Sequence, residues 1–170
     1  VVLLLFLVFV FGGTLGAGLP GADPAGGREA YVAYVMPGIL LLTIAGSAGG
    51  TATTVSMDMA EGITARFRTM AISRAAVLAG HVLGNTIQAI IAVVLVLGVG
   101  LLIGFRPTAG PAEWIAAAGL LVLIAFAISW LGVAMGMQAK SVETASNLPL
   151  LLTFLPFLSS GFVPTESMPE

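Results

Sequence analysis

Five apolar stretches, separated by short polar connections, dominate the sequence. They lie at about 1–19, 31–55, 81–103, 114–137 and 148–163. Because a helix rises 1.5 Å per residue and the bilayer core is about 30 Å thick, about 20 apolar residues are enough to cross it. The first stretch barely reaches that length, and the last is short and interrupted by Pro149, Pro156 and Gly161. The pattern predicts an all-α, polytopic transmembrane helical bundle with about five spans, the last of them kinked or re-entrant.

The segment between the second and third stretches, from Met57 to Ser73, breaks this apolar pattern. Within it, four apolar residues share one side of a helix: Met59, Ile63, Phe67 and Met70. The spacing predicts a short amphipathic helix at about 57–70 that is too polar to span. It could lie on the lipid headgroups with its apolar side down, or it could offer charges to a cytoplasmic partner. Periodicity alone leaves both interpretations open.

Charged residues are few, and their distribution predicts an orientation. Of 170 residues, 6 are basic and 8 acidic, where a soluble domain would have about a quarter of its residues charged. This excludes a soluble globular domain, and without a basic surface there is no basis for nucleic-acid binding. The segments 57–80 and 138–147 carry four basic residues against two on the other side, Arg28 and Arg106. The positive-inside rule therefore predicts that both segments are cytoplasmic.

The residues needed for common enzyme and metal chemistry are missing. The sequence has no Cys and a single His, which leaves no Cys/His metal cluster. A P-loop requires Gly-Lys before Ser or Thr, but Lys140 is the sole lysine and follows Ala139. The carboxylates fall in predicted loops and interfaces, so no pair of buried acids is available for intramembrane catalysis. The sequence predicts a protein that is not an enzyme and holds no cofactor of its own.

Polar residues do occur inside the predicted spans. His81, Asn85 and Gln88 recur at i, i+4 and i+7 and form one stripe, while Ser47 and Thr51 lie in a small, hydroxyl-rich part of the second span. Polar groups at such depth face protein or water. They could hydrogen-bond between helices or line a substrate path, and both hypotheses stay open. His81 has no ionisable partner within any predicted span, which argues against proton-coupled transport.

Glycine pairs at GxxxG spacing permit close approach of helices. Five pairs are present: Gly12/Gly16, Gly46/Gly50, Gly80/Gly84, Gly100/Gly104 and Gly132/Gly136. They are typical of general close packing or of a dimer seam.

Two segments carry a family resemblance. The sequence from Met57 to Gly80 (MDMAEGITARFRTMAISRAAVLAG) resembles the cytoplasmic segment of ABC-2 type permeases, in particular the daunorubicin-resistance-type exporters of actinobacteria. The second segment, ASNLP at 145–149 followed by PFLSSGFVP at 156–164 and Met168-Pro169, resembles the fifth-span signature of that family. Ala71 departs from the Pro that members often have.

This resemblance implies a single ABC-2 type transmembrane domain over 1–170 that is part of a six-span permease of the bacterial cell membrane. On that basis the chain is expected to be truncated at both ends. The resemblance also implies pairing with a second permease copy, and a coupling helix at 57–70 seated on a separate ATP-binding subunit that binds ATP and Mg²⁺. Carried over by position, the ATPase contacts are Asp58, Glu61, Arg66, Phe67 and Arg68.

The expected function is therefore ATP-driven export of a hydrophobic or amphipathic substrate such as a drug or lipid. The possible substrate path comprises Asn85, Gln88, Ser47 and Thr51. The alternatives are a channel, a secondary transporter or a non-transporting membrane scaffold.

Overall fold

The computed structural model describes residues 1–13, 27–62 and 74–158, and the described residues contain helices and their connections but no strands. Three long helices dominate: α2 (Gly27–Ala60), α4 (Arg74–Ile103) and α5 (Pro111–Gln138). The shorter elements are α1 (Val2–Phe6), the π-helix η1 (Leu7–Phe11), α6 (Val142–Asn147), α7 (Leu150–Phe154) and the 3₁₀ turn η3 (Leu155–Leu158). The predicted all-α class is confirmed.

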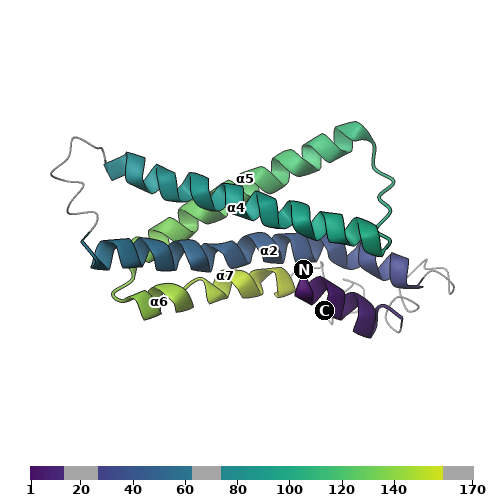
Figure 1. Ribbon diagram of the computed structural model, residues 1–170, viewed down its shortest axis with the longest axis horizontal. Coiled ribbons are helices and arrows are strands. Elements are labelled where there is room, and N and C mark those ends of the chain that lie inside the picture. Colours follow the sequence, from purple (N-terminus) through teal and green to yellow (C-terminus); the bar gives the residue numbers. More distant parts are fainter. Residues whose placement is uncertain (14–26, 63–73, 159–170) are drawn as a thin grey trace, which may run out of the picture.

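Helix α2 is the centre of the bundle. Helices α4 and α5 pack against it on one side and cross each other, whereas α6 and α7 run along its other side (Figure 1). The C-terminal end of α2, the start of α4 and the connection between α5 and α6 lie at one end of the bundle, and the connection between α4 and α5 lies at the other (Figure 1). The described parts of the two predicted cytoplasmic segments, residues 57–62 and 74–80 of the first and 138–147 of the second, fall at the same end.

Three of the predicted spans correspond to helices that are long and apolar enough to cross a membrane, namely α2, α4 and α5. Each is longer than its predicted apolar stretch, because helix-forming residues continue beyond the apolar ones. The outer two of the five expected spans are not confirmed. The described part of 1–19 is the short helix α1 followed by the π-helix η1. The described part of 148–163 is broken into α7 and η3.

Proline accounts for the breaks near the C-terminal end of the described chain. Pro149 precedes the first residue of α7, and Pro156 lies in the 3₁₀ turn that follows it. A proline has no N–H to donate and clashes with the preceding helical turn, so it favours the first turn of a helix over its interior. Part of the predicted polar loop at 138–147 is itself helical: α6 begins after Ser141, whose side chain accepts a hydrogen bond from the Thr144 N–H.

The end of α2 differs from the expected break at Met57. Residues 57–60 form its last turn, and Gly62 ends the helix with φ of 71°, a left-handed conformation that favours glycine. The Gly62 N–H donates to the Met59 carbonyl oxygen at 3.3 Å. Of the predicted coupling helix at 57–70, residues 57–60 belong to α2, residues 61–62 form a turn, and residues 63–70 lie outside the described residues.

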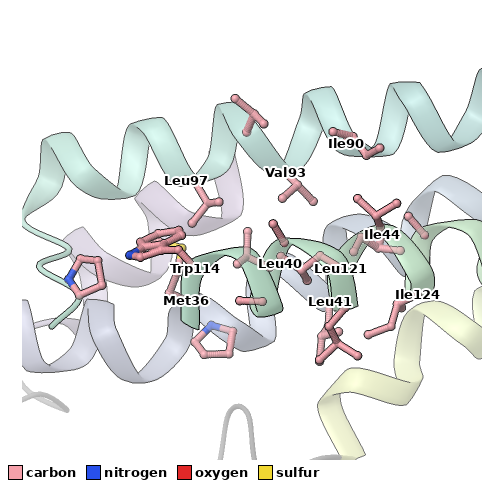
Figure 2. A pocket seen from close by; sticks show the side chains of 18 of the residues that line it. Met36, Leu40, Leu41, Ile44, Ile90, Val93, Leu97, Trp114, Leu121 and Ile124 are labelled. Atoms are coloured by element: carbon pink, nitrogen blue, oxygen red, sulfur yellow. The ribbon is translucent and has the colours of Figure 1, made fainter. Parts of the chain in front are cut away.

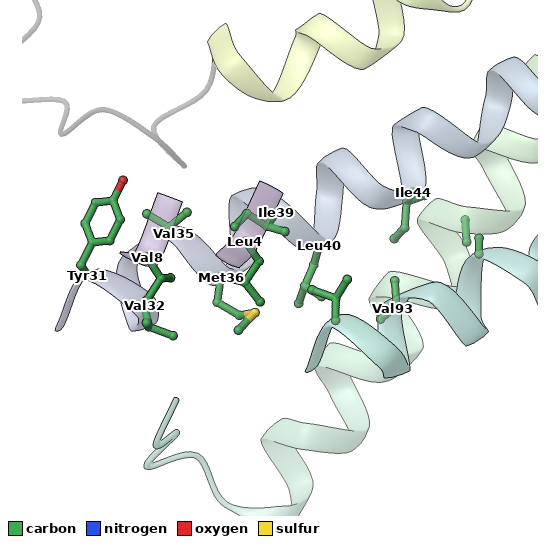
Figure 3. Packing of buried hydrophobic residues seen from close by; sticks show 13 residues of the cluster. Leu4, Val8, Tyr31, Val32, Val35, Met36, Ile39, Leu40, Ile44 and Val93 are labelled. Atoms are coloured by element: carbon green, nitrogen blue, oxygen red, sulfur yellow. The ribbon is translucent and has the colours of Figure 1, made fainter. Parts of the chain in front are cut away.

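The main core lies between α2 and the helices packed around it. Its fully buried side chains include Leu4 and Val8 from the N-terminal helical segment, Val32 and Ile44 from α2, and Val96 from α4 (Figure 3). Figure 3 shows Leu4 and Val8 beside the first half of α2, with Ile44 further along that helix. In contrast, most of the first ten residues of α5 are exposed. An apolar surface of this kind is expected to face lipid or another apolar partner.

Of the five glycine pairs, Gly132/Gly136 brings two helices into close contact. A Cβ placed on Gly136 would lie 2.6 Å from the Ala52 carbonyl oxygen and 3.0 Å from the Val55 Cβ of α2. A Cβ on Gly132 would lie 3.0 Å from the Ala48 carbonyl oxygen. The pairs Gly46/Gly50 and Gly80/Gly84 meet no described neighbour. Gly100/Gly104 also lies against α2, since a Cβ on Gly100 would clash with the Met36 side chain and a Cβ on Gly104 would lie 3.4 Å from the Glu29 Cγ. General helix packing is thus the role of Gly132/Gly136 and Gly100/Gly104, whereas Gly46/Gly50 and Gly80/Gly84 remain open to a contact outside this chain.

We expect Gly136→Ala to destabilise the bundle by about 1–3 kcal/mol, because the new methyl group meets backbone that cannot move aside. The matched control is Gly119→Ala in the same helix, where a Cβ meets nothing within 4 Å. Alanine there should be neutral or stabilise by about 0.5–1 kcal/mol through its helix propensity. Thermal unfolding in detergent compares the two variants, and equal effects would contradict the proposed close contact.

Candidate functional site

A contact between an imidazole and a carboxylate joins the C-terminal end of α2 to the N-terminal part of α4. The Nε2 of His81 lies 2.9 Å from the Oδ2 of Asp58, and both side chains are partly shielded, with 20% and 29% of their surfaces exposed. The sequence placed Asp58 in a surface segment and found no ionisable partner for His81 within any predicted span. The structure supplies a partner from beyond the predicted span, because the continuation of α2 through Ala60 carries Asp58 to α4.

Below this pair lie two further layers. Val55, Val82 and Val133, one from each long helix, form a small buried cluster. The next layer is polar and is referred to below as the polar hub, which consists of Ser47, Asn85, Thr86 and Ser129.

The polar hub connects all three long helices by hydrogen bonds. The Asn85 Nδ2 donates to the Ser129 Oγ at 2.8 Å and to the Ser47 Oγ at 3.3 Å. The single hydroxyl proton of Thr86 is shared between the Val82 carbonyl oxygen at 2.7 Å and the Ser129 Oγ at 3.2 Å. The Ser129 hydroxyl donates to the Ala125 carbonyl oxygen, which leaves its oxygen free to accept from both neighbours. Among the described residues, no buried side-chain polar atom lacks a hydrogen-bond partner.

The hub supports one of the two interpretations of the predicted polar stripe. Asn85 and Ser47 hydrogen-bond between helices, and the Thr51 hydroxyl bonds to the Ser47 carbonyl oxygen beside Gly132. Gln88 takes no part, because its place on α4 is exposed. The structure therefore brings together three of the four residues that the sequence assigned to a substrate path, and it separates the fourth from them.

Two members of the hub, Thr86 and Ser129, were missed by the sequence prediction. Ser129 carried a usable signal, since it is the single hydroxyl residue between positions 114 and 137. A lone polar residue in an apolar span faces protein more often than lipid. Thr86 carried no such signal, because it could bond to its own helix, as it also does with the Val82 carbonyl oxygen.

The predicted ATPase contacts are only partly described. Glu61 follows the last turn of α2 and is exposed. Arg66, Phe67 and Arg68 lie outside the described residues. The structure therefore places Asp58 against α4 and leaves Glu61 available at the surface.

An apolar cavity of about 440 Å³ opens at the opposite end of the bundle, between α2, α4 and α5. It forms where α5 diverges from the other two helices beyond their crossing (Figures 1 and 2). Its walls include Met36 and Leu40 of α2, Val93 and Leu97 of α4, and Trp114 and Leu121 of α5 (Figure 2). The small side chains of Ala117 and Ala118 leave the α5 wall open. A cavity of this size and polarity is suited to an apolar group.

Gly110 and Glu113 fix the start of α5 at the rim of this cavity. The Glu113 carboxylate accepts a hydrogen bond from the Gly110 N–H at 2.9 Å, and Pro111 occupies the first helical position. Directly after the end of α4, Gly104 has φ of 118°, and the Phe105 N–H donates to the Gly100 carbonyl oxygen at 2.9 Å. The end of α4 and the start of α5 thus fix the connection between them, which lines this end of the cavity.

The sequence matches the ABC-2 type transporter family over residues 1–170. The chain belongs to this family. It is 30% identical over 169 residues to the daunorubicin resistance ABC transporter permease protein DrrB1 of Streptomyces coeruleorubidus, covering 99% of this chain and 56% of that protein. It is 26% identical over 150 residues to a probable doxorubicin resistance ABC transporter permease protein DrrC of Mycobacterium tuberculosis, covering 84% of this chain and 54% of the relative.

The chain spans about half the length of the curated relatives it matches. No solved structure matches it. The family and the three long apolar helices identify this ABC-2 chain as part of a multi-pass membrane protein.

The polar hub gives a measurable prediction for this ABC-2 chain. Ser129→Ala removes the oxygen that accepts from both Asn85 and Thr86, and we expect it to destabilise the bundle by about 0.6–1.7 kcal/mol. Thr54→Ala is the control, because the Thr54 hydroxyl is exposed and bonds only to its own helix, at the Gly50 carbonyl oxygen. Thermal unfolding in detergent should separate the two variants, and equal stability would mean that the hub bonds add nothing.

Proposed function

We propose that this chain is the core of a permease subunit of an ATP-driven ABC exporter, which moves a hydrophobic or amphipathic substrate outward across the bacterial cell membrane. The observation that carries the proposal is the family match over the whole chain, with relatives named as drug resistance permeases. In this proposal a separate ABC subunit binds ATP and Mg²⁺, and a second permease copy completes the transport path.

The cavity supports the apolar part of this substrate class. Its walls come from three candidate membrane spans, so a ligand could enter from the bilayer without crossing water. Burying apolar surface is favourable by roughly 25 cal/mol for each Å², which is enough to bind a drug-sized apolar body without a dedicated charge. The polar hub, by contrast, supports a packing role, since its members bond to one another.

The exposed C-terminal end of α2 supports the proposal that the ATPase binds at this end of the bundle. Glu61 is exposed directly before the segment that contains Arg66, Phe67 and Arg68. We propose that these four residues contact the ATPase and that the segments 57–80 and 138–147 are cytoplasmic. The described residues of both segments fall at the same end of the bundle, as this orientation requires (Figure 1).

Charge reversal at the proposed ATPase contact tests the partner. The complete permease is co-expressed with a candidate P-loop ATPase subunit, and Glu61→Arg or Arg68→Glu is expected to reduce co-purification by about tenfold, as the loss of a desolvated charge pair would. Glu143→Arg, an exposed acidic residue of α6, is the control and should leave the complex intact. Retained association in both test variants would exclude this contact, and gradient-driven transport without the ATPase would favour a secondary transporter.

Filling the cavity tests the substrate. Ala118→Phe places a ring in the cavity and is expected to lower ATP-dependent export of a lipophilic fluorescent dye by about tenfold, since the apolar group loses its contact surface. Ala116→Phe adds the same ring at an exposed position of α5 that does not line the cavity and should leave export unchanged. Dye efflux from proteoliposomes measures both variants. Equal export by the two variants would show that the cavity does not take the substrate.

A further inference from the structure

We propose that Asp58 and His81 are positioning residues that fix the end of α2 against α4, so that Asp58 acts inside the chain and not at the ATPase surface. This inference rests on the proposed function, because it concerns how the segment between the two residues would transmit movement. The sequence analysis assigned Asp58 and Glu61 the same role, as ATPase contacts. This inference gives the two residues different roles.

The position of Asp58 on α2 is unfavourable without a partner. It lies in the last turn of the helix, which contains no basic residue, and there the negative end of the helix macrodipole opposes a carboxylate. His81 supplies the compensating donor at 2.9 Å from the neighbouring helix. Glu61 lies beyond the last turn and is exposed, so solvent can satisfy its carboxylate. The two acidic residues are therefore held by different environments.

The packing below the pair makes it a fixed joint. Val55, one turn before Asp58, and Val82, adjacent to His81, are both almost fully buried and meet Val133 of α5 in the small cluster. Asp58 and His81 lie next to this cluster in the sequences of α2 and α4, towards the end of the bundle. The packing already orders the two helices. The side chains of Asp58 and His81 therefore lose little conformational entropy when they come into contact.

The pair also joins the two ends of the predicted coupling segment. The 22 residues from 59 to 80 lie between Asp58 and His81 in the sequence, yet the two side chains are in contact. A displacement applied to that segment would therefore reach α2 and α4 as one unit. Without the pair, the end of α2 could move independently, and part of the displacement would not reach the bundle.

A reciprocal exchange tests this role in the complete permease with its ATPase, reconstituted in proteoliposomes. Asp58→His and His81→Asp each place two like groups together and are expected to lower the amount of dye exported per ATP hydrolysed by about fivefold. The double variant restores an acid facing an imidazole and should recover export to within about twofold of the unmodified protein. Glu143→His in α6 is the control for adding a histidine at this end and should leave export unchanged.

Co-purification of the same variants with the ATPase distinguishes the two roles of Asp58. All of them should retain the ATPase if the pair is internal. Failure of the double variant to recover export, single variants that export normally, or loss of the ATPase in every variant at position 58 would each overturn the inference. The last result would still support the proposed function, since it would identify Asp58 as an ATPase contact.

Thermal unfolding of the unmodified permease, the two single variants and the double variant, each without the ATPase, provides an independent measure of the contact between Asp58 and His81. Single variants that unfold at lower temperature, with recovery in the double variant, would establish the contact even if the unmodified permease bound no ATPase. In that case the proposed function would fail and the pair would stand. Unfolding that is unchanged in both single variants would overturn the pair itself.

Discussion

The close approach of α5 to α2 at Gly132 and Gly136 is the contact on which the other interhelical contacts depend. Lipid chains are as apolar as the side chains of a membrane helix, so helices associate in a bilayer mainly through close packing and hydrogen bonds. With no side chain on these glycines, the α5 backbone lies directly against Ala48 and Ala52. Ser129, one turn earlier on α5, is thereby brought within hydrogen-bonding distance of Asn85.

The bundle is consequently tight at one end and open at the other. The Asp58–His81 pair, the valine cluster and the polar hub follow one another along the tight end, and each connects at least two of the three long helices. Beyond the crossing of α4 and α5, the cavity is lined on α5 by the small side chains of Ala117 and Ala118. Such a division is suited to a subunit that receives movement at one end and holds an apolar substrate towards the other.

The candidate site could be predicted from the sequence only in part. Asn85 and Ser47 were identifiable because polar residues in an apolar span must find a protein partner. Gln88 satisfies the same helical spacing and yet is exposed, since its direction relative to α2 and α5 is set by how α4 packs. The pairing of Asp58 with His81 was not predictable, because it required α2 to continue past the last apolar residue and to end beside a helix that starts far along the chain.

The sequence by itself determined the class of this protein and the positions of its three long spans. Long apolar stretches in a bilayer must become helices, because a backbone without water can satisfy its hydrogen bonds only within itself. The tertiary structure alone decided which glycine pairs touch another helix, which polar residues meet, and where the cavity lies. These features depend on helix rotation and crossing, which are set by many side-chain contacts between segments that are distant in the chain.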